Sequence, residues 1–319
     1  MTLTGISIKE KASSTNTAEI DSHHDSTPDL DTMRIAKYVT DSDPTPMIGL
    51  VEGDGIRALA AGPGALSRLL HASDVEAEVR TLLSRDGGER PLDSVRLLAP
   101  IDAQEVWGAG VTYERSKVAR QEESEQGGSF YDLVYRAPRP ELFFKATPSR
   151  VVGPGQAIRV RRDTGWCVPE PELALVLSPT LRLVGFTVGN DVSARDIEGE
   201  NPLYLPQAKV YDACCALGPV VTLTAALPPI ASVSIRLTID RQGHTVFEGT
   251  TPLSRIARTF DELIRWLGID NVFPDGVILL TGTGIVPPDE FTLKAGDLVA
   301  IEIDGIGRLV NPVVQASPG

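Results

Sequence analysis

The feature that most constrains the fold of this chain is a pair of glutamates, Glu170 and Glu172, placed directly before the apolar run 173–177. Such a run, with no charge in it, predicts a strand that is buried on both faces. Side chains alternate along a strand, so residues two apart project from the same face. A buried carboxylate needs a partner. Unless both glutamates lie on a solvated strand face, the fold must supply a neutralising group to them.

A third carboxylate follows about twenty residues later, in the segment 190–196, which reads Asn-Asp-Val-Ser-Ala-Arg-Asp. If Asp191 meets Glu170 and Glu172, three mutually repelling carboxylates share one place, and a hard divalent cation is the natural counter-charge. Oxygen ligands favour Mg²⁺, Mn²⁺ or Ca²⁺ over Zn²⁺, and no histidine lies near in sequence. We therefore predict a magnesium site at Glu170, Glu172 and Asp191, with Mn²⁺ or Ca²⁺ as possible substitutes.

The charge balance limits the partners. With 43 acidic and 30 basic residues, the formal net charge is -13, which argues against a nucleic acid. An anionic small substrate stays compatible, because local cations and a metal ion can outweigh the global charge. No apolar run approaches the ~18 residues of a membrane span. The three cysteines predict buried, reduced thiols, and we expect a cytoplasmic protein without a membrane partner.

The sequence divides into three parts. Residues 1–32 are polar and aperiodic and predict a disordered arm, in which His23 and His24 are taken as solvated rather than as metal ligands. Residues 33–100 predict a small α+β domain, and 101–319 a sheet-rich catalytic domain. Strands are expected near 34–38, 48–56 (a hairpin), 95–100, 151–152, 157–160, 173–177, 183–188, 220–223, 233–239, 277–280 and 298–303, and helices near 64–86 and 253–267.

Three further features are candidates for binding or proton transfer. Lys209 follows a polar, proline-broken loop, and it is either a surface lysine or, beside a metal ion, an acid or base that Asp212 orients. The turn at Gly282 and Thr283 exposes backbone N–H groups and a hydroxyl that can hold a carboxylate. Lys145 is either a surface charge or a cation for the substrate.

Several motifs occur together and in order. They are Gly110-Val111-Thr112-Tyr113, Phe144-Lys145, Val152-Gly153-Pro154-Gly155, Glu170-Pro171-Glu172, the segment 190–196, Lys209, Gly218-Pro219 and Thr281-Gly282-Thr283-Gly284. Over about 105–315 the chain resembles the fumarylacetoacetate hydrolase superfamily. This resemblance implies a mixed β-sandwich roll, Mg²⁺ held by Glu170, Glu172 and Asp191, and a homodimer or a dimer-based higher homo-oligomer.

One departure from the family pattern bears on the reaction. C–C bond hydrolases of this family carry a histidine three residues after the motif tyrosine and a glutamate three residues later, and here these positions are Ser116 and Ala119. The motif asparagine is Thr112, and no histidine lies within forty residues of Ser116. Serine without a partner base is a poor replacement for imidazole at neutral pH. Water attack by the usual route of the family is therefore not expected.

The segments 139–147, 166–170 and 200–211 resemble 2-keto-3-deoxy-sugar-acid dehydratases. This resemblance implies loss of water from a 2-keto-3-deoxy pentonate such as arabinonate, through a metal-stabilised enolate, to give 2-oxoglutarate semialdehyde. The roles expected are Lys209 as base, Glu114 or Glu141 as acid, and Lys145, Thr283, Gly282 and Tyr113 as substrate-binding residues. Residues 115–128 are a candidate lid. The alternatives are a C–C bond hydrolase of a diketo acid or acylpyruvate, and a non-catalytic metal-dependent binding module.

Overall fold

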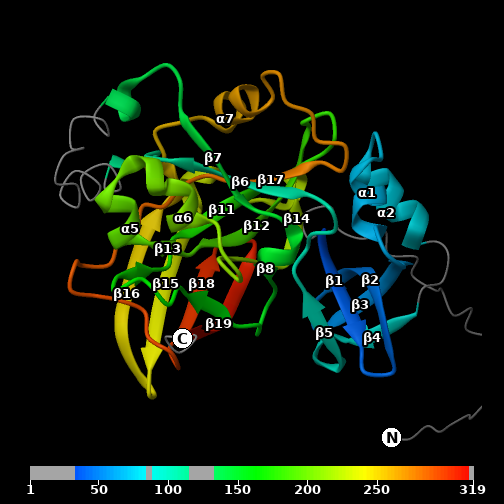
Figure 1. Ribbon diagram of the computed structural model, residues 1–319. Helices are drawn as coiled ribbons and strands as arrows, with labels where there is room; N and C mark the ends of the chain where they lie inside the picture. The colour runs from blue at the N-terminus through cyan, green and yellow to red at the C-terminus, as the bar shows by residue number, and fades with distance from the viewer. Residues whose placement is uncertain (1–32, 84–87, 115–132, 316–319) are drawn as a thin grey trace, which may run out of the picture.

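The computed structural model describes residues 33–83, 88–114 and 133–315. The predicted arm 1–32 with His23 and His24, and the predicted lid 115–128 with Ser116 and Ala119, lie outside these residues. Two β-sheets packed face to face dominate the described part, and short helices cover the edges (Figure 1). The predicted sheet-rich α+β fold is confirmed.

The larger sheet has twelve strands in the order β4-β3-β2-β1-β14-β12-β11-β17-β6-β7, with β5 added on β1 and β8 added on β14. Its strands are β1 (Arg34–Thr40), β2 (Asp43–Glu52), β3 (Gly55–Ala61), β4 (Glu89–Pro91), β5 (Val95–Leu98), β6 (Glu105–Gly110), β7 (Glu141–Ala146), β8 (Val151–Val152), β11 (Pro171–Leu177), β12 (Leu183–Asp191), β14 (Cys215–Leu223) and β17 (Val277–Leu280). Strand β11 lies inside the sheet, between β12 and β17.

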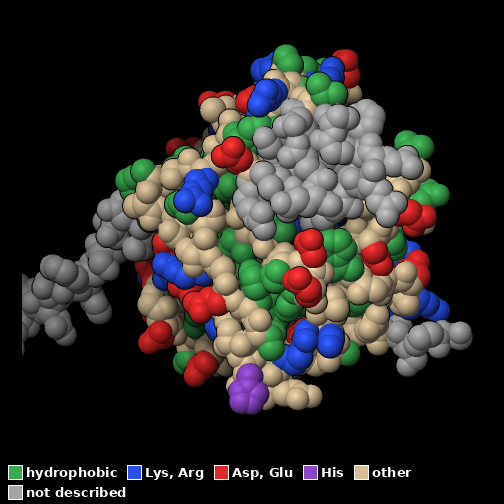
Figure 2. Space-filling model, turned by 90° about the vertical axis from the view of Figure 1, so that its left-hand side faces the viewer, with side chains coloured by type: hydrophobic (Ala, Val, Ile, Leu, Met, Phe, Trp, Pro, Cys, Tyr) green, Lys and Arg blue, Asp and Glu red, His purple; other side chains and the backbone are tan. Residues whose placement is uncertain are grey.

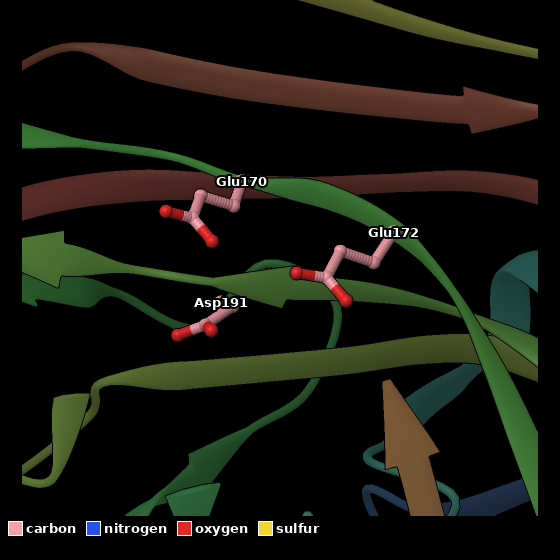
Figure 3. A group of neighbouring side chains, drawn as sticks. All are labelled: Glu170, Glu172 and Asp191. Atoms are coloured by element: carbon pink, nitrogen blue, oxygen red, sulfur yellow. The ribbon is translucent and has the colours of Figure 1, made fainter. Parts of the chain in front are cut away.

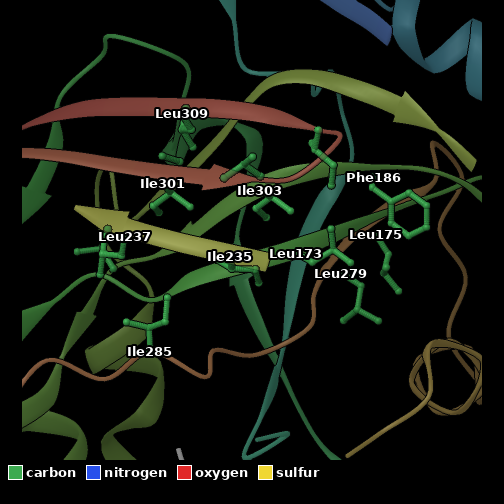
Figure 4. Close-up of a cluster of buried hydrophobic side chains, with 14 of the residues drawn as sticks. Leu173, Leu175, Phe186, Ile235, Leu237, Leu279, Ile285, Ile301, Ile303 and Leu309 are labelled. Atoms are coloured by element: carbon green, nitrogen blue, oxygen red, sulfur yellow. The ribbon is translucent and has the colours of Figure 1, made fainter. Parts of the chain in front are cut away.

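The smaller sheet has the order β16-β15-β18-β19-β9. Its strands are β9 (Ile158–Val160), β15 (Ser234–Arg241), β16 (His244–Pro252), β18 (Leu298–Ile303) and β19 (Gly307–Gln315). Leu173 and Leu175 of β11 pack against Ile235 and Leu237 of β15 and their neighbours, which forms the main core (Figure 4). Ala174 and Val176 face the opposite side, in a second core with the N-terminal part of the chain. The prediction that β11 is buried on both faces is confirmed.

The helices are shorter than the sequence pattern indicated. They are α1 (Ala65–Leu70), α2 (Val75–Leu83), α5 (Arg195–Glu200), α6 (Leu205–Lys209) and α7 (Phe260–Leu267). Within its described residues, 64–83, the predicted helical stretch is divided between α1 and α2. The predicted helix 253–267 was wrong in its first half: α7 begins only after Thr259, whose side chain accepts a hydrogen bond from the Glu262 backbone N–H as an N-cap. Leu253 is buried, but in a separate 3₁₀ turn.

The N-terminal part shares a sheet with the rest of the molecule. Strand β1 pairs antiparallel with β14, with Ile35 opposite Val221. The domain boundary at residue 100 stays a prediction. In the part of the chain that the structure describes, no helix is long and apolar enough to cross a membrane. On the face shown in Figure 2, the Lys and Arg side chains of described residues are scattered among acidic ones rather than gathered in one patch.

Candidate metal centre

The three predicted ligands meet because β11 and β12 are neighbouring antiparallel strands. Pro171 pairs with Asn190, which places Glu170 and Glu172 beside Asp191 at the end of β12. The Asp191 backbone N–H also donates to the Glu170 carbonyl at 3.0 Å. One carboxylate oxygen from each residue lies within 4.8 Å of the others, and the three are 4%, 2% and 0% exposed (Figure 3). Three carboxylates this close and this buried require positive charge beside them.

Lys145 supplies part of that charge. Its side chain is fully buried, and its Nζ lies 2.5 Å from Asp191 Oδ1. The ammonium also donates to the carbonyl oxygens of Val192 at 3.0 Å and Lys209 at 2.6 Å. Burial disfavours the charged form, but Asp191 and its surroundings outweigh this effect and raise the pKa of Lys145. Lys145 is therefore a cation held behind Asp191.

Lys209 and Arg195 supply the rest. The Lys209 Nζ donates to Glu170 Oε2 at 2.9 Å, Asp191 Oδ2 at 3.0 Å and Ser193 Oγ at 2.6 Å. The Arg195 Nη2 donates to Glu170 Oε1 at 2.9 Å. Both side chains are at most 2% exposed. Glu170 thus lies between two cations, while Lys209 bridges two of the three predicted ligands.

Glu172 has a different environment. The Gly282 backbone N–H donates to its Oε2 at 2.5 Å. Desolvation, together with repulsion from Asp191 and Glu170, raises the pKa of Glu172 well above its ordinary value, although Lys209 and the Gly282 N–H oppose this rise. Gly282 has φ +91, and a Cβ there would lie 2.0 Å from Thr112 Oγ1. The turn after β17 therefore requires glycine to bring its N–H to Glu172.

One cavity collects most of the predicted site residues. It is lined by Ala109, Gly110, Val111, Glu141, Phe143, Glu170, Glu172, Glu198, Lys209, Gly282 and Thr283. Glu141, Lys209, Gly282 and Thr283 were predicted for catalysis or substrate binding, and the structure brings them to the two glutamate ligands. Glu141 is half-buried, whereas Thr283 is buried.

Four predicted residues lie elsewhere. Glu114 is exposed and is not among the described residues that line the cavity. Lys145 and Tyr113 are 0% and 1% exposed and are not among the residues that line the cavity. Asp212, expected to orient Lys209, pairs with Arg159 at 3.0 Å near the surface.

The sequence reasoning missed two buried charges on α5. Arg195 and Glu198 are the residues that this helix buries, and they are three apart, on one face. The signal was present in the sequence, because Arg195 belongs to the segment 190–196. Glu198 begins the polar, proline-broken loop, residues 198–206, that the sequence predicts before Lys209.

The residues present fit a divalent metal ion. The ligand set is all oxygen, which suits Mg²⁺. Five carboxylates (Glu141, Glu170, Glu172, Asp191 and Glu198) are gathered with three cations (Lys145, Arg195 and Lys209). Glu170, Glu172 and Asp191 are the residues that would hold the ion.

Comparison with known proteins agrees with this geometry. Residues 105–314 match the family described as fumarylacetoacetate (FAA) hydrolase C-terminal. The chain is 51% identical over 214 residues to a probable 2-keto-3-deoxyxylonate dehydratase of Haloferax volcanii, a match that covers 67% of this chain and 73% of the relative. It is 48% identical over 225 residues to a 2-dehydro-3-deoxy-D-arabinonate dehydratase of Saccharolobus solfataricus, covering 70% of this chain and 76% of the relative.

A solved structure is also similar. It is a 2-keto-3-deoxy-D-arabinonate dehydratase complexed with magnesium and 2,5-dioxopentanoate, with a TM-score of 0.76 and 38% identity. The match covers 90% of this chain and 100% of the solved one. Magnesium in that structure agrees with the ion predicted from the oxygen ligands here. The family match spans well over half of the sequence, and this chain belongs to the fumarylacetoacetate hydrolase family.

Proposed function

We propose that this protein is a magnesium-dependent dehydratase that removes water from a 2-keto-3-deoxy pentonate and releases 2-oxoglutarate semialdehyde, which is 2,5-dioxopentanoate. The observation that carries the proposal is the cavity itself, which places Lys209 and two further carboxylic acids beside the metal-binding triad. Proton transfer to and from the substrate needs such groups, and a hydrolytic water is not required.

The lack of a suitable histidine in the described part supports elimination over hydrolysis. The two described histidines, His71 and His244, are exposed and do not line the cavity. Two of the similar proteins point the same way, because the relatives from Haloferax volcanii and Saccharolobus solfataricus are dehydratases of 2-keto-3-deoxy pentonates by name.

The residues have separable tasks in this proposal. A bound Mg²⁺ lowers the free energy of negative charge on the 2-keto oxygen of the substrate. With a bound Mg²⁺ in place of its charge beside Glu170 and Asp191, Lys209 acts as the neutral amine and takes the proton from C3. Thr283 with the Gly282 turn holds the substrate carboxylate. Lys145 stays behind Asp191 and fixes its position. A carboxylic acid of the cavity, for which Glu141 is the candidate named from the sequence, protonates the hydroxyl that leaves from C4.

The bond changes balance without an oxidant or a reductant. The C3–H and C4–O bonds break, a C3–C4 double bond forms, and water leaves. Transfer of a proton from C5 to C3 then gives the C4–C5 enol, and transfer of the enol hydroxyl proton to C4 gives the C5 aldehyde. C4 is the one stereocentre of the substrate, so the D-xylonate and D-arabinonate skeletons lead to the same 2-keto-3-deoxy acid, and selectivity reduces to the configuration at C4.

Product analysis tests this function. The protein with Mg²⁺ is incubated with the D and L forms of 2-keto-3-deoxy pentonate, and the products are followed by proton NMR. We expect the aldehyde signal of 2,5-dioxopentanoate from one form. Pyruvate and glycolaldehyde would instead indicate C–C cleavage. A substrate that raises the melting temperature but is never consumed would indicate a binding module.

A further inference from the structure

Glu198 is a buried acid on α5 with no role assigned by sequence. It is 6% exposed, and it lies on the same side of the helix as Arg195. The helix is short, and its other acidic residues differ from Glu198: Asp196 is part-buried and accepts from the Gly165 N–H at 2.7 Å, and Glu200 is exposed at the helix end. Burying a carboxyl group costs free energy unless a partner or a ligand compensates. The position therefore has to be explained by what the carboxyl group faces.

Arg195 links Glu198 to the metal-binding triad. The Arg195 Nη2 lies 2.9 Å from Glu170 Oε1, and the Arg195 Nε forms an ion pair with Glu198 Oε2 at 4.0 Å. Asp191 and Glu198 also belong to one short segment that runs from β12 through β13 (Ser193–Ala194) into α5. Glu198 lines the same cavity as Lys209. A small substrate held at the triad therefore meets Lys209 and Glu198 together.

The two acids named from the sequence are placed less favourably. Glu114 is exposed and does not line the cavity. Glu141 does line it but is only half-buried, and its carboxylate lies over the backbone of Gly110, where a Cβ would be 2.1 Å from Glu141 Oε2. Among these three, Glu198 is the acid most shielded from water and the one tied through Arg195 to a ligand.

We propose that Glu198 is the catalytic acid that protonates the leaving C4 hydroxyl. With this acid the bound substrate loses water, and without it the reaction stops at proton exchange on C3. This inference rests on the proposed function and deepens it. The C3–H electron pair forms the new double bond, the C4–O pair leaves with oxygen, and that oxygen takes the Glu198 proton and departs as water. The proton held by Lys209 then returns through solvent to Glu198, which restores both groups.

The test separates the two halves of the reaction. 2-Oxobutanoate carries hydrogens on C3 but no hydroxyl on C4, so in D₂O it reports C3 proton exchange alone by proton NMR. The variant Glu198→Gln keeps the size of the side chain and removes the acid. We expect it to lose ~100-fold or more in dehydration, the usual contribution of a general acid, while C3 exchange stays within about tenfold of the unmodified chain.

A substrate whose leaving group needs no proton makes the test specific. The analogue with fluorine in place of the C4 hydroxyl expels fluoride, which ¹⁹F NMR detects. Glu198→Gln should release fluoride within about tenfold of the unmodified chain, because the missing proton is no longer required. The matched control Glu200→Gln, on the exposed end of the same helix, should change none of the three rates. Mg²⁺ binding measured by calorimetry should be similar in both variants.

The outcomes distinguish this proposal from the function on which it rests. If Glu198→Gln dehydrates the natural substrate within tenfold of the unmodified chain, Glu198 is not the acid. If exchange, dehydration and fluoride release all fall together, the residue acts on binding or folding, and the proposal is wrong. An unmodified chain that performs none of the three reactions with Mg²⁺ contradicts the proposed function itself.

Discussion

Replacing Lys145 with methionine tests whether the cations behind the triad are structural. Lys145 is fully buried against Asp191, and Lys145→Met keeps much of its volume while removing the charge. Breaking one side of a buried ion pair costs about 3–5 kcal/mol, because the remaining charge stays buried without its partner. Asp191 keeps Lys209 at 3.0 Å, so we expect the lower end of this range. The carbonyls of Val192 and Lys209 also lose a donor.

The assay is urea denaturation at neutral pH in the presence of EDTA. The matched control is Lys294→Met, which removes an exposed lysine and should change the unfolding free energy by about 0.5 kcal/mol or less. Adding Asp191→Asn to Lys145→Met should recover part of the loss, with a coupling free energy of about 1 kcal/mol or more. A Lys145→Met protein as stable as the control would refute the assignment of Lys145 as the counter-ion of Asp191.

Three further predictions follow from the buried groups around the site. Gly282→Ala, which brings a Cβ against Thr112, should weaken Mg²⁺ binding measured by calorimetry, because the turn must move away from Glu172; unchanged affinity would contradict this. In the folded, metal-free protein the raised pKa of Glu172 favours its protonated form, and this contribution to stability is lost as pH rises through that pKa. Mg²⁺ needs the ionised carboxylate, so the Mg²⁺-induced rise in melting temperature should grow from pH 5.5 to 8, and a flat profile would count against this. Burial raises the pKa of the Cys167 thiol to about 12, and all three cysteines are buried and free, so a disulfide reagent at pH 8 should label three thiols only after denaturation.

The parts of the site that depend on local pattern were predictable from the sequence. The apolar run of β11 follows directly from its residues, and Glu170 and Glu172 follow from strand alternation. Predicting Asp191 as a third ligand required a further inference, namely that β12 lies beside β11. The family resemblance implied this arrangement, and the antiparallel pairing of the two strands confirms it.

The remaining features depend on tertiary contacts that no periodicity reveals. Lys145 stands on β7, far from Asp191 in sequence, and nothing local distinguishes it from a lysine in solvent. Glu198 sits in a polar segment whose helix is too short for an apolar stripe, and it is buried beside Arg195. Leu253 continues the spacing of α7 but packs as part of a separate turn, because Thr259 caps the helix later.

The most direct test of the central claim is the initial rate of 2,5-dioxopentanoate formation from 2-keto-3-deoxy pentonate, measured as free Mg²⁺ is restored to EDTA-treated protein. The account predicts no turnover without metal, a saturable rise with Mg²⁺, and no such rise in the Glu170→Gln variant, which lacks one carboxylate of the buried triad. Turnover that persists in EDTA, or that survives unchanged in Glu170→Gln, would contradict it.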